Sequence, residues 1–412
     1  MSIDIQNDVA QNHQTAGEAT PWIDRFGVSL MKSMGTPLRL LSRGEGCYVW
    51  DEDGTQYLDF LAGIAVNSLG HAHPAFVEAV SRQAATLAHV SNYFTTAPQL
   101  ELAERLKRIS GAGPEGRVYF GNSGAEANEA AFKLARLNAS GGRHRILALH
   151  DSFHGRTMGA LALTGKPSLR DAFEPMPSGV EHIDTTIEAL EAAIDDTVAA
   201  LVIEPIKGEA GVLDVPDGFL ERARELTEQH GVLLILDEIQ TGAGRTGTWF
   251  AYQQAGILPD AVTVAKGIGG GFPIGALITF GWASELFQRG MHGSTFGGNP
   301  LATATANAVL AEIEASDLVS NAATRGEQLR RIIDDIGSPL VDQVRGRGLL
   351  VGVGLTSPVA GAVAAAALDA GLIVNAANDS SIRIAPPLIV GDTELRLFAE
   401  RFRDALAAVE AS

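Results

Sequence analysis

Apolar positions change their spacing along the chain, and this predicts strands that alternate with helices. Short runs of consecutive apolar residues, typical of strands buried on both faces, occur at 117–120, 145–150, 199–204, 232–236, 261–265 and 276–280. Stretches with helical spacing occur at 74–89, 97–109, 124–138 and 217–230. Buried strands separated by helices predict a parallel α/β sheet that is covered on both faces.

The two ends of the chain have a different pattern. Residues 44–60 predict a β-hairpin, with Asp53 and Gly54 as its turn. A long helical stretch at 301–335 and two later helices flank short predicted strands at 349–355, 372–375 and 381–384. This second pattern is typical of an α+β arrangement.

A chain of 412 residues, 46% of them hydrophobic, is long enough for two or more domains. We expect a large α/β domain at 67–303 and a smaller α+β domain at 304–412. The N-terminal segment, residues 1–66, is expected to contribute to the smaller domain.

Charge and polarity narrow the class of protein. The formal net charge of −18 argues against nucleic acid or an acidic membrane as the main partner. The polar residues 1–20 lack the basic and apolar parts of a signal peptide, and no apolar run reaches the roughly 18 residues of a membrane span. We therefore expect a cytoplasmic protein. The single cysteine, Cys47, excludes an internal disulfide, and His71 and His73 have no further ligands at metal-site spacing, so no metal site is predicted.

One lysine has the setting of a reactive group. The β-branched run Val262–Val264 leads to Lys266, and several glycines follow. A strand end delivers a side chain to the edge of a sheet, where α/β proteins bind their ligands. A lysine whose amine is removed from solvent there can lose its proton, and it can then act as a nucleophile or bond to an aldehyde. Of the six lysines only Lys207 also follows an apolar strand run, so it is the alternative.

A carboxylate is predicted at the same edge. Five apolar residues lead to Asp237, where a buried charge is costly unless it meets a cation. Asp237 and Lys266 are 29 residues apart, about one strand–crossover–strand unit, so both side chains are expected at one edge of the sheet. Alternatively, Asp237 is an ordinary helix N-cap.

Two further segments follow predicted strands. Residues 121–129 turn from a strand into a helix at Ser123 and Gly124, and free N–H groups at a helix start favour an anion. Phe153 and Arg156, after the strand at 145–150, could stack on a planar ring and hold a carboxylate. Each segment also has an ordinary structural interpretation, as an N-cap and as a polar loop. Together, an anion site, an aromatic ring, a carboxylate and a lysine suit pyridoxal phosphate.

At these residues the chain resembles the class III pyridoxal-phosphate aminotransferases of fold type I. The resemblance runs from about residue 35 to the C-terminus and rests on residues 63–67, 70–74, 122–129, 154–157, 236–242, 265–267 and 293–300. Within the class it is most similar to the acetylornithine aminotransferases of arginine biosynthesis. The resemblance implies a large, mostly parallel sheet domain with helices on both faces and a smaller α+β domain.

The resemblance implies a role for each matching residue in cofactor binding. Lys266 would bond to the cofactor and move the proton, and Asp237 would pair with the ring nitrogen. Thr295 would reach the phosphate from the other subunit, which implies a homodimer with active sites at its interface. The phosphate, ring face and ring hydroxyl would be contacted by Ser123, Gly124, Ala125, Phe153, His154 and Gln240. Many relatives have threonine where this chain has Ala125, which removes a hydroxyl contact but leaves the backbone donors.

The resemblance also implies how substrates are held. Arg156 would bind a substrate carboxylate, and Arg383 the α-carboxylate of glutamate. Glu209 would pair with Arg383 when that arginine is not needed. Asn67 and Ser294 are the remaining residues expected on the substrate side.

The implied reaction is a reversible, ping-pong transfer of the terminal amine between N2-acetylornithine and 2-oxoglutarate, which becomes glutamate. Ornithine δ-aminotransferases are the first alternative. Those relatives carry a tyrosine that helps hold ornithine, whereas Ile64 stands here, and this favours an acylated substrate. Succinyldiaminopimelate could use the same site. Glutamate-1-semialdehyde aminomutase and a non-enzymatic pyridoxal-phosphate-binding regulator are less favoured alternatives.

Overall fold

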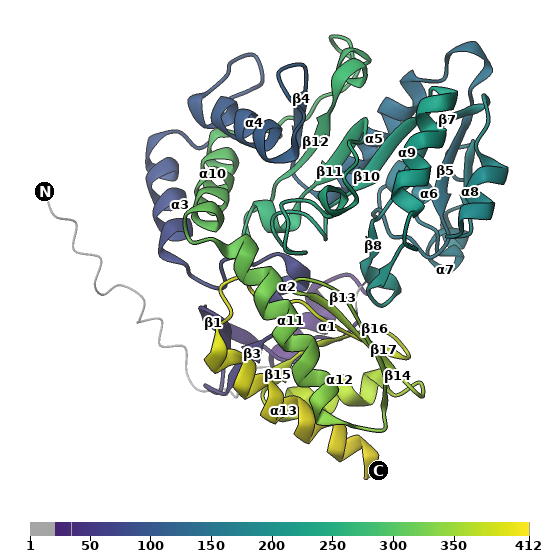
Figure 1. Ribbon diagram of the computed structural model, residues 1–412. Coiled ribbons are helices and arrows are strands. Elements are labelled where there is room, and N and C mark those ends of the chain that lie inside the picture. The colour runs from purple at the N-terminus through teal and green to yellow at the C-terminus, as the bar shows by residue number, and fades with distance from the viewer. Residues whose placement is uncertain (1–20, 34, 412) are drawn as a thin grey trace, which may run out of the picture.

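A seven-stranded sheet forms the centre of the larger part of the molecule, in a computed structural model that describes residues 21–33 and 35–411 (Figure 1). The predicted polar lead, residues 1–20, lies outside the described residues. Along the sheet the strands are β4 (Arg117–Gly121), β12 (Gly275–Thr279), β11 (Ala261–Val264), β10 (Leu233–Asp237), β7 (Val198–Ile203), β5 (Arg145–Leu149) and β6 (Val180–Ile183). The predicted α/β sheet is confirmed.

β12 differs from the other strands in direction. It pairs antiparallel with both β11 and β4, whereas every other pair in this sheet is parallel. The expectation of a parallel strand at 276–280 is therefore wrong. Only ten residues separate β11 from β12, and a parallel return needs a crossover of about a dozen or more. The sheet is mostly parallel, and β4, β11, β10, β7, β5 and β6 all run in one direction.

Helices cover the sheet and extend its edge. The elements along this part of the chain are α3 (Pro74–Thr86), α4 (Ala97–Ser110), α5 (Gly124–Leu137), α6 (Met158–Leu163), α7 (Pro167–Arg170), α8 (Ile187–Ala193), α9 (Phe219–His230) and α10 (Pro300–Ala315). The predicted helices at 74–89, 97–109, 124–138 and 217–230 are confirmed. In Figure 1, α3, α4 and α10 lie side by side beyond β4, and α10 contacts both of the others. The sequence did not predict β6, α6 or α8.

The C-terminal part forms a second, four-stranded sheet with helices. Its strands follow the order β13 (Val341–Arg347), β14 (Leu350–Leu355), β17 (Ser381–Ile384) and β16 (Asn375–Asn378), and its helices are α11 (Leu318–Ile336), α12 (Ala360–Asp369) and α13 (Asp392–Glu410). The helical stretch predicted at 301–335 is in fact two helices, because Asp317 between α10 and α11 has a left-handed backbone, with φ 49°.

The N-terminal residues join this part of the molecule. The predicted hairpin forms from β2 (Tyr48–Asp51) and β3 (Gln56–Asp59), and β1 (Leu41–Glu45) extends it. β3 pairs in parallel with β15 (Leu372–Ile373), so segments more than 300 residues apart in sequence lie side by side (Figure 1). Short elements complete the fold: α1 (Trp22–Ser29), α2 (Ala62–Ala65), β8 (Ile206–Lys207) and β9 (Leu213–Asp214). The division at 1–66, 67–303 and 304–412 stays a prediction.

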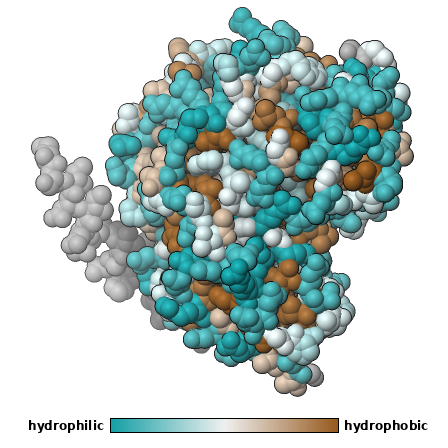
Figure 2. Space-filling view, viewed as in Figure 1, coloured by the Kyte–Doolittle hydropathy of each residue, from teal (hydrophilic) through white to brown (hydrophobic). Residues whose placement is uncertain are grey.

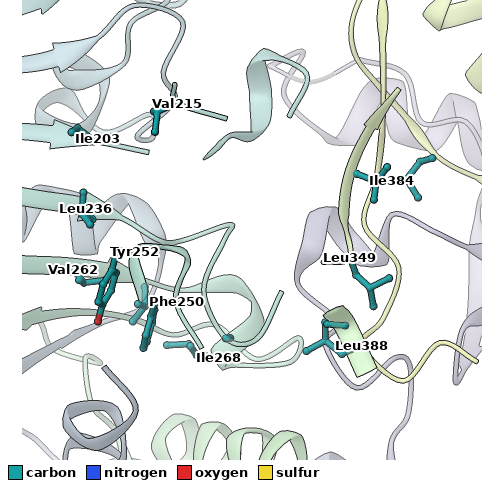
Figure 3. Packing of buried hydrophobic residues seen from close by; sticks show 14 of the residues in the cluster. Ile203, Val215, Leu236, Phe250, Tyr252, Val262, Ile268, Leu349, Ile384 and Leu388 are labelled. Carbon is teal, nitrogen blue, oxygen red and sulfur yellow. The ribbon is translucent and has the colours of Figure 1, made fainter. Parts of the chain in front are cut away.

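One hydrophobic cluster connects the large sheet with the C-terminal part. Figure 3 shows Leu236 and Val262 on the large sheet, and Leu349 and Ile384 in the C-terminal part, as members of this cluster. Burial of such side chains is the main force that fixes the strands in place. Residues that directly follow these strands are therefore held at defined positions.

The surface is largely hydrophilic on the face in view, with separate hydrophobic patches (Figure 2). Among residues 21–33 and 35–411, no helix is long and apolar enough to cross a membrane.

Candidate active site

A cavity of about 400 Å³ lies where the parallel strands of the large sheet end. Strands β4, β5, β7, β10 and β11 run in one direction, so the residues that follow them meet at one edge. Nine residues predicted for the site line the cavity: Ser123, Gly124, Ala125, Phe153, His154, Arg156, Asp237, Gln240 and Lys266.

The start of α5 lines one side of the cavity. Ser123 is the N-cap, and its Oγ accepts a hydrogen bond from Glu126 N at 3.1 Å. The N–H groups of Gly124 and Ala125 have no acceptor within the described part of the chain. Unpaired donors at the positive end of a 14-residue helix favour a phosphate or carboxylate there. Ser123 is therefore an N-cap, and the anion site at the same helix start stays a prediction.

Asp237, at the end of β10, is a buried carboxylate that accepts three hydrogen bonds and still lines the cavity. Its Oδ2 accepts from His154 Nδ1 and from Asn128 Nδ2, each at 2.7 Å. Its Oδ1 accepts from Ile239 N at 3.0 Å. Burial alone lowers the pKa of His154, but the hydrogen bond and charge of Asp237 outweigh this and raise it. The second ring nitrogen, His154 Nε2, is buried and has no hydrogen-bond partner among the described residues.

Lys266 follows β11, the strand that pairs with β10. Asp237 at the end of β10 is in register with Thr263 of β11, so Lys266 comes close to Asp237 at the edge of the sheet. Its backbone has φ 45°, an uncommon conformation for a residue with a side chain. Burial lowers the pKa of Lys266, and the nearby charge of Arg383 lowers it further, against the opposing effect of Glu209. A lowered pKa increases the fraction of molecules in which this amine is neutral and therefore nucleophilic.

Lys207, the alternative lysine, has a different setting. Its Nζ donates to His150 O at 3.1 Å and to Thr185 Oγ1 at 3.0 Å. Burial also lowers the pKa of Lys207. However, Lys207 does not line the cavity, whereas Lys266 does. The position of Lys266 in the lining of the cavity therefore favours Lys266 over Lys207 as the reactive group.

Glu204 is a cavity residue that sequence reasoning did not assign to the site. It directly follows β7, and its Oε2 accepts from Phe153 N at 2.7 Å. Burial, which outweighs the opposing charge of His154, raises the pKa of Glu204 to about 7. The signal in the sequence was a carboxylate directly after an apolar run, as for Asp237. The other unassigned lining residues include Val66, Asn122, Ile239, Phe272 and Ile274.

Arg383 and Glu209 form an ion pair beside the cavity. Arg383, on β17, is 1% exposed, and its Nη1 donates to Glu209 Oε1. The same Nη1 lies 3.3 Å from Gln240 Oε1, and Nη2 donates to Asn375 Oδ1 at 2.8 Å. Burial raises the pKa of Glu209, but the charge and hydrogen bond of Arg383 outweigh it and lower the pKa. Neither residue lines the cavity itself, and Gln240 connects the pair to it.

Arg156 lines the cavity but is exposed, and three other predicted residues do not line it. Arg156 is exposed, with its guanidinium carbon 5.8 Å from the centre of the Phe153 ring. Ser294 Oγ accepts from Asn122 Nδ2 at 3.1 Å, and Thr295 is exposed. Asn67 packs at Gly271, where an added Cβ would lie 3.2 Å from Asn67 Oδ1. The structure does not bring Asn67, Ser294 or Thr295 into the lining of the cavity.

These residues fit pyridoxal phosphate. The cofactor needs an anion site for its phosphate, a carboxylate for its ring nitrogen and an amine for its aldehyde. The cavity offers the unpaired N–H groups at the start of α5, the carboxylate of Asp237 and the amine of Lys266, for which the structure records no hydrogen bond within the described residues.

Comparisons with known proteins agree with this arrangement. A family model described as aminotransferase class-III matches residues 30–406. Acetylornithine aminotransferase of Mycobacterium tuberculosis is 53% identical over 372 residues, which cover 90% of this chain and 92% of the relative. The solved ornithine aminotransferase of Toxoplasma gondii has a TM-score of 0.89 and 33% identity, covering 95% of each chain. N-acetylornithine aminotransferase from Stenotrophomonas maltophilia has a TM-score of 0.80 and 39% identity, covering 91% of this chain and 97% of that one.

Proposed function

The chain belongs to the class-III aminotransferase family, and from this premise we propose that it transfers the terminal amine of N2-acetylornithine to 2-oxoglutarate. The reaction is reversible and ping-pong, and in the biosynthetic direction glutamate is the amine donor. The observation that carries the proposal is the cavity, in which Lys266, Asp237 and the start of α5 meet next to the Arg383–Glu209 pair. The names of the relatives, acetylornithine aminotransferase at 49–53% identity, support the choice of substrate.

Pyridoxal phosphate, which the family implies, supplies an aldehyde that takes up the amine and a ring that accepts electrons from the reacting carbon. The N–H groups of Gly124 and Ala125, with Ser123, would hold its phosphate. The negative charge of Asp237 would keep the ring nitrogen protonated. His154 and Asn128 hold this carboxylate in one position. The remaining contacts, by stacking and to the ring hydroxyl, are proposed for Phe153 and Gln240.

Lys266 would carry the proton during the transfer. Its amine Nζ would take a proton from the reacting carbon and return it in the reverse reaction. This role needs an amine that is neutral in part of the molecules. The lowered pKa of Lys266, caused by burial and by the charge of Arg383, supports that requirement.

The two substrates place their carboxylates differently. Glutamate reacts at its α-amine, so its α-carboxylate lies beside the reacting carbon, whereas N2-acetylornithine reacts at its terminal amine and has no carboxylate there. We infer that Arg383 binds the α-carboxylate of glutamate and that Glu209 covers Arg383 when acetylornithine is bound. An uncovered buried arginine would be destabilising. Arg156, which lines the cavity, would bind the remaining carboxylate of either substrate, and Asn67 and Ser294 are also proposed for the substrate side.

Ornithine is the second candidate substrate, because a solved ornithine aminotransferase has the same fold at a TM-score of 0.89. Ile64 argues against it. This residue is 37% exposed and has no side-chain donor for the free amino-acid end of ornithine. An acylated substrate does not need that donor.

A homodimer is part of the proposal. Asn92 Nδ2 donates to Ser294 O at 3.0 Å, which holds the loop at 92–94 beside Thr295. This region exposes Tyr93, Phe94 and Phe296, at 94%, 71% and 60%. Large exposed apolar groups of this kind mark a contact surface. A second subunit there would bring Thr295 to the neighbouring phosphate. A cytoplasmic location stays a prediction.

The experiment is to mix the yellow, cofactor-loaded protein with N2-acetylornithine in the absence of a keto acid. We expect the yellow absorbance to disappear and to return when 2-oxoglutarate is added. Conversion by ornithine but not by acetylornithine would replace the proposed substrate. A protein that gains no absorbing cofactor when pyridoxal phosphate is added would contradict the proposal as a whole.

A further inference from the structure

The backbone around Glu209 is held from three sides. Glu209 lies in a short turn (Gly208–Ala210) that directly follows β8 and contacts β16; both strands are labelled in Figure 1. Lys166 Nζ donates to Glu209 O at 2.6 Å, and Asn378 Nδ2 donates to Ala210 O at 2.8 Å. Arg345 Nε donates to Gly211 O at 2.9 Å. With its backbone fixed in this way, Glu209 can leave Arg383 by rotation of its side chain.

A carboxylate that leaves Arg383 needs another cation. The side chain of Glu209 is only 28% exposed, so water would compensate its charge incompletely. Besides Arg383, the positive charges that act on the pKa of Glu209 are those of Lys266 and Lys166. Lys266 is committed to the amine transfer in the proposed function. Lys166 is half-buried and forms no ion pair with any carboxylate in the described residues.

We propose that Lys166 is the second cation of Glu209: it receives the carboxylate when a substrate carboxylate occupies Arg383. Lys166 is then a positioning residue that acts through Glu209 and determines how easily the site accepts a dicarboxylate. The inference rests on the proposed function, in which Glu209 covers Arg383 for one substrate and releases it for the other. Because Glu209 stays on Arg383 with acetylornithine, Lys166 should matter for only one half of the reaction.

The test measures each half-reaction separately in three variants of the cofactor-loaded protein. Lys166→Met removes the cation, Lys166→Arg retains it, and Asn378→Ala removes a neutral donor to the same turn. We expect Lys166→Met to lower kcat/KM for glutamate and 2-oxoglutarate about five- to tenfold, with less than about a twofold change for N2-acetylornithine. Lys166→Arg should restore most of the loss. Asn378→Ala should change both half-reactions by the same factor.

A binding measurement gives a second readout that does not depend on catalysis. Glutarate has two carboxylates but neither an amine nor a keto group, so it can bind without reacting. Its dissociation constant, measured by calorimetry, should rise about five- to tenfold in Lys166→Met and stay near the wild-type value in Lys166→Arg. In a Glu209→Ala background, Lys166→Met should have no further effect on glutarate binding.

Three outcomes would overturn the inference while the proposed function stands. In all three, the wild-type protein reacts with N2-acetylornithine. In the first, Lys166→Met slows both half-reactions equally, and in the second it slows neither. In the third, Asn378→Ala produces the same selective loss as Lys166→Met. The last result would mean that only the position of the turn matters. A wild-type protein that fails to react with N2-acetylornithine would instead refute the proposed function.

Discussion

Asp237 and Glu209 are two carboxylates at one site, yet they are held in different ways. Asp237 is 4% exposed and accepts three hydrogen bonds, from His154, Asn128 and Ile239. Glu209 has a side chain that is 28% exposed, and within the part of the chain that the structure describes its carboxylate has one ion-pair partner, Arg383. Moving Asp237 would leave several buried groups without partners, whereas Glu209 can rotate and break one contact. The comparison indicates a fixed cofactor side and an adjustable substrate side.

The largest effect is expected from Asp237→Asn. The amide has the same shape but no negative charge, so the ring nitrogen of the cofactor would lose the group that keeps it protonated. We expect kcat to fall about 100- to 1,000-fold for both half-reactions, since fixed charges in active sites contribute on this scale. Stopped-flow absorbance of each half-reaction measures the loss. Near-normal rates with bound cofactor would mean that Asp237 is only a structural carboxylate.

A smaller and selective effect is expected from Glu209→Gln. The variant leaves the charge of Arg383 uncovered, which should favour glutamate and disfavour N2-acetylornithine. We expect the ratio of their kcat/KM values to shift about tenfold towards glutamate.

Asp214→Asn is the matched control for this variant. The side chain of Asp214, on β9, is also 28% exposed, and its Oδ1 accepts from Nε of Arg347, on β13, at 2.7 Å. This substitution should leave the ratio unchanged. An unchanged ratio in Glu209→Gln would show that the pair is not a substrate switch.

The last expected effect is on stability rather than on activity, and it depends on pH. Burial raises the pKa of Glu204 from its usual 4.5 to about 7, so ionisation of this carboxyl destabilises the folded protein relative to the unfolded chain. The contribution of this carboxyl to stability is complete below about pH 4.5 and is lost as pH rises through 7. Glu204→Gln does not titrate and can still accept from Phe153 N.

We therefore expect Glu204→Gln to be more stable than the wild type by about 1–3 kcal/mol at pH 8, with the difference vanishing towards pH 4.5. Denaturant unfolding at several pH values measures it. A difference that is constant with pH would refute the titration of Glu204.

Much of the fold and part of the site could be predicted from the sequence. Buried strands are short apolar runs, and the spacing between Asp237 and Lys266 matches one crossover unit, so their place at one edge of the sheet could be predicted. The structure adds that their strands, β10 and β11, are neighbours. The direction of β12 depended on the length of one loop. Glu204 was seen as a strand-end carboxylate, but nothing in the sequence indicated that Phe153 would bond to it.

The substrate side could not be derived in the same way. Glu209 and Arg383 are 174 residues apart, and no periodic pattern connects them. The pair was predicted from a resemblance, and the structure brings the two side chains together. Lys166 had no signal at all, because its contact is to the backbone carbonyl of Glu209, which every residue has.

The most direct test of the central claim is to identify the lysine that carries the cofactor. The yellow protein is treated with borohydride, which fixes the cofactor to its lysine, and is then digested and sequenced by mass spectrometry. We predict that the added pyridoxyl mass lies on Lys266, the lysine whose side chain reaches the cavity. A label on Lys207 or on any other lysine would contradict the assignment of this cavity as the active site.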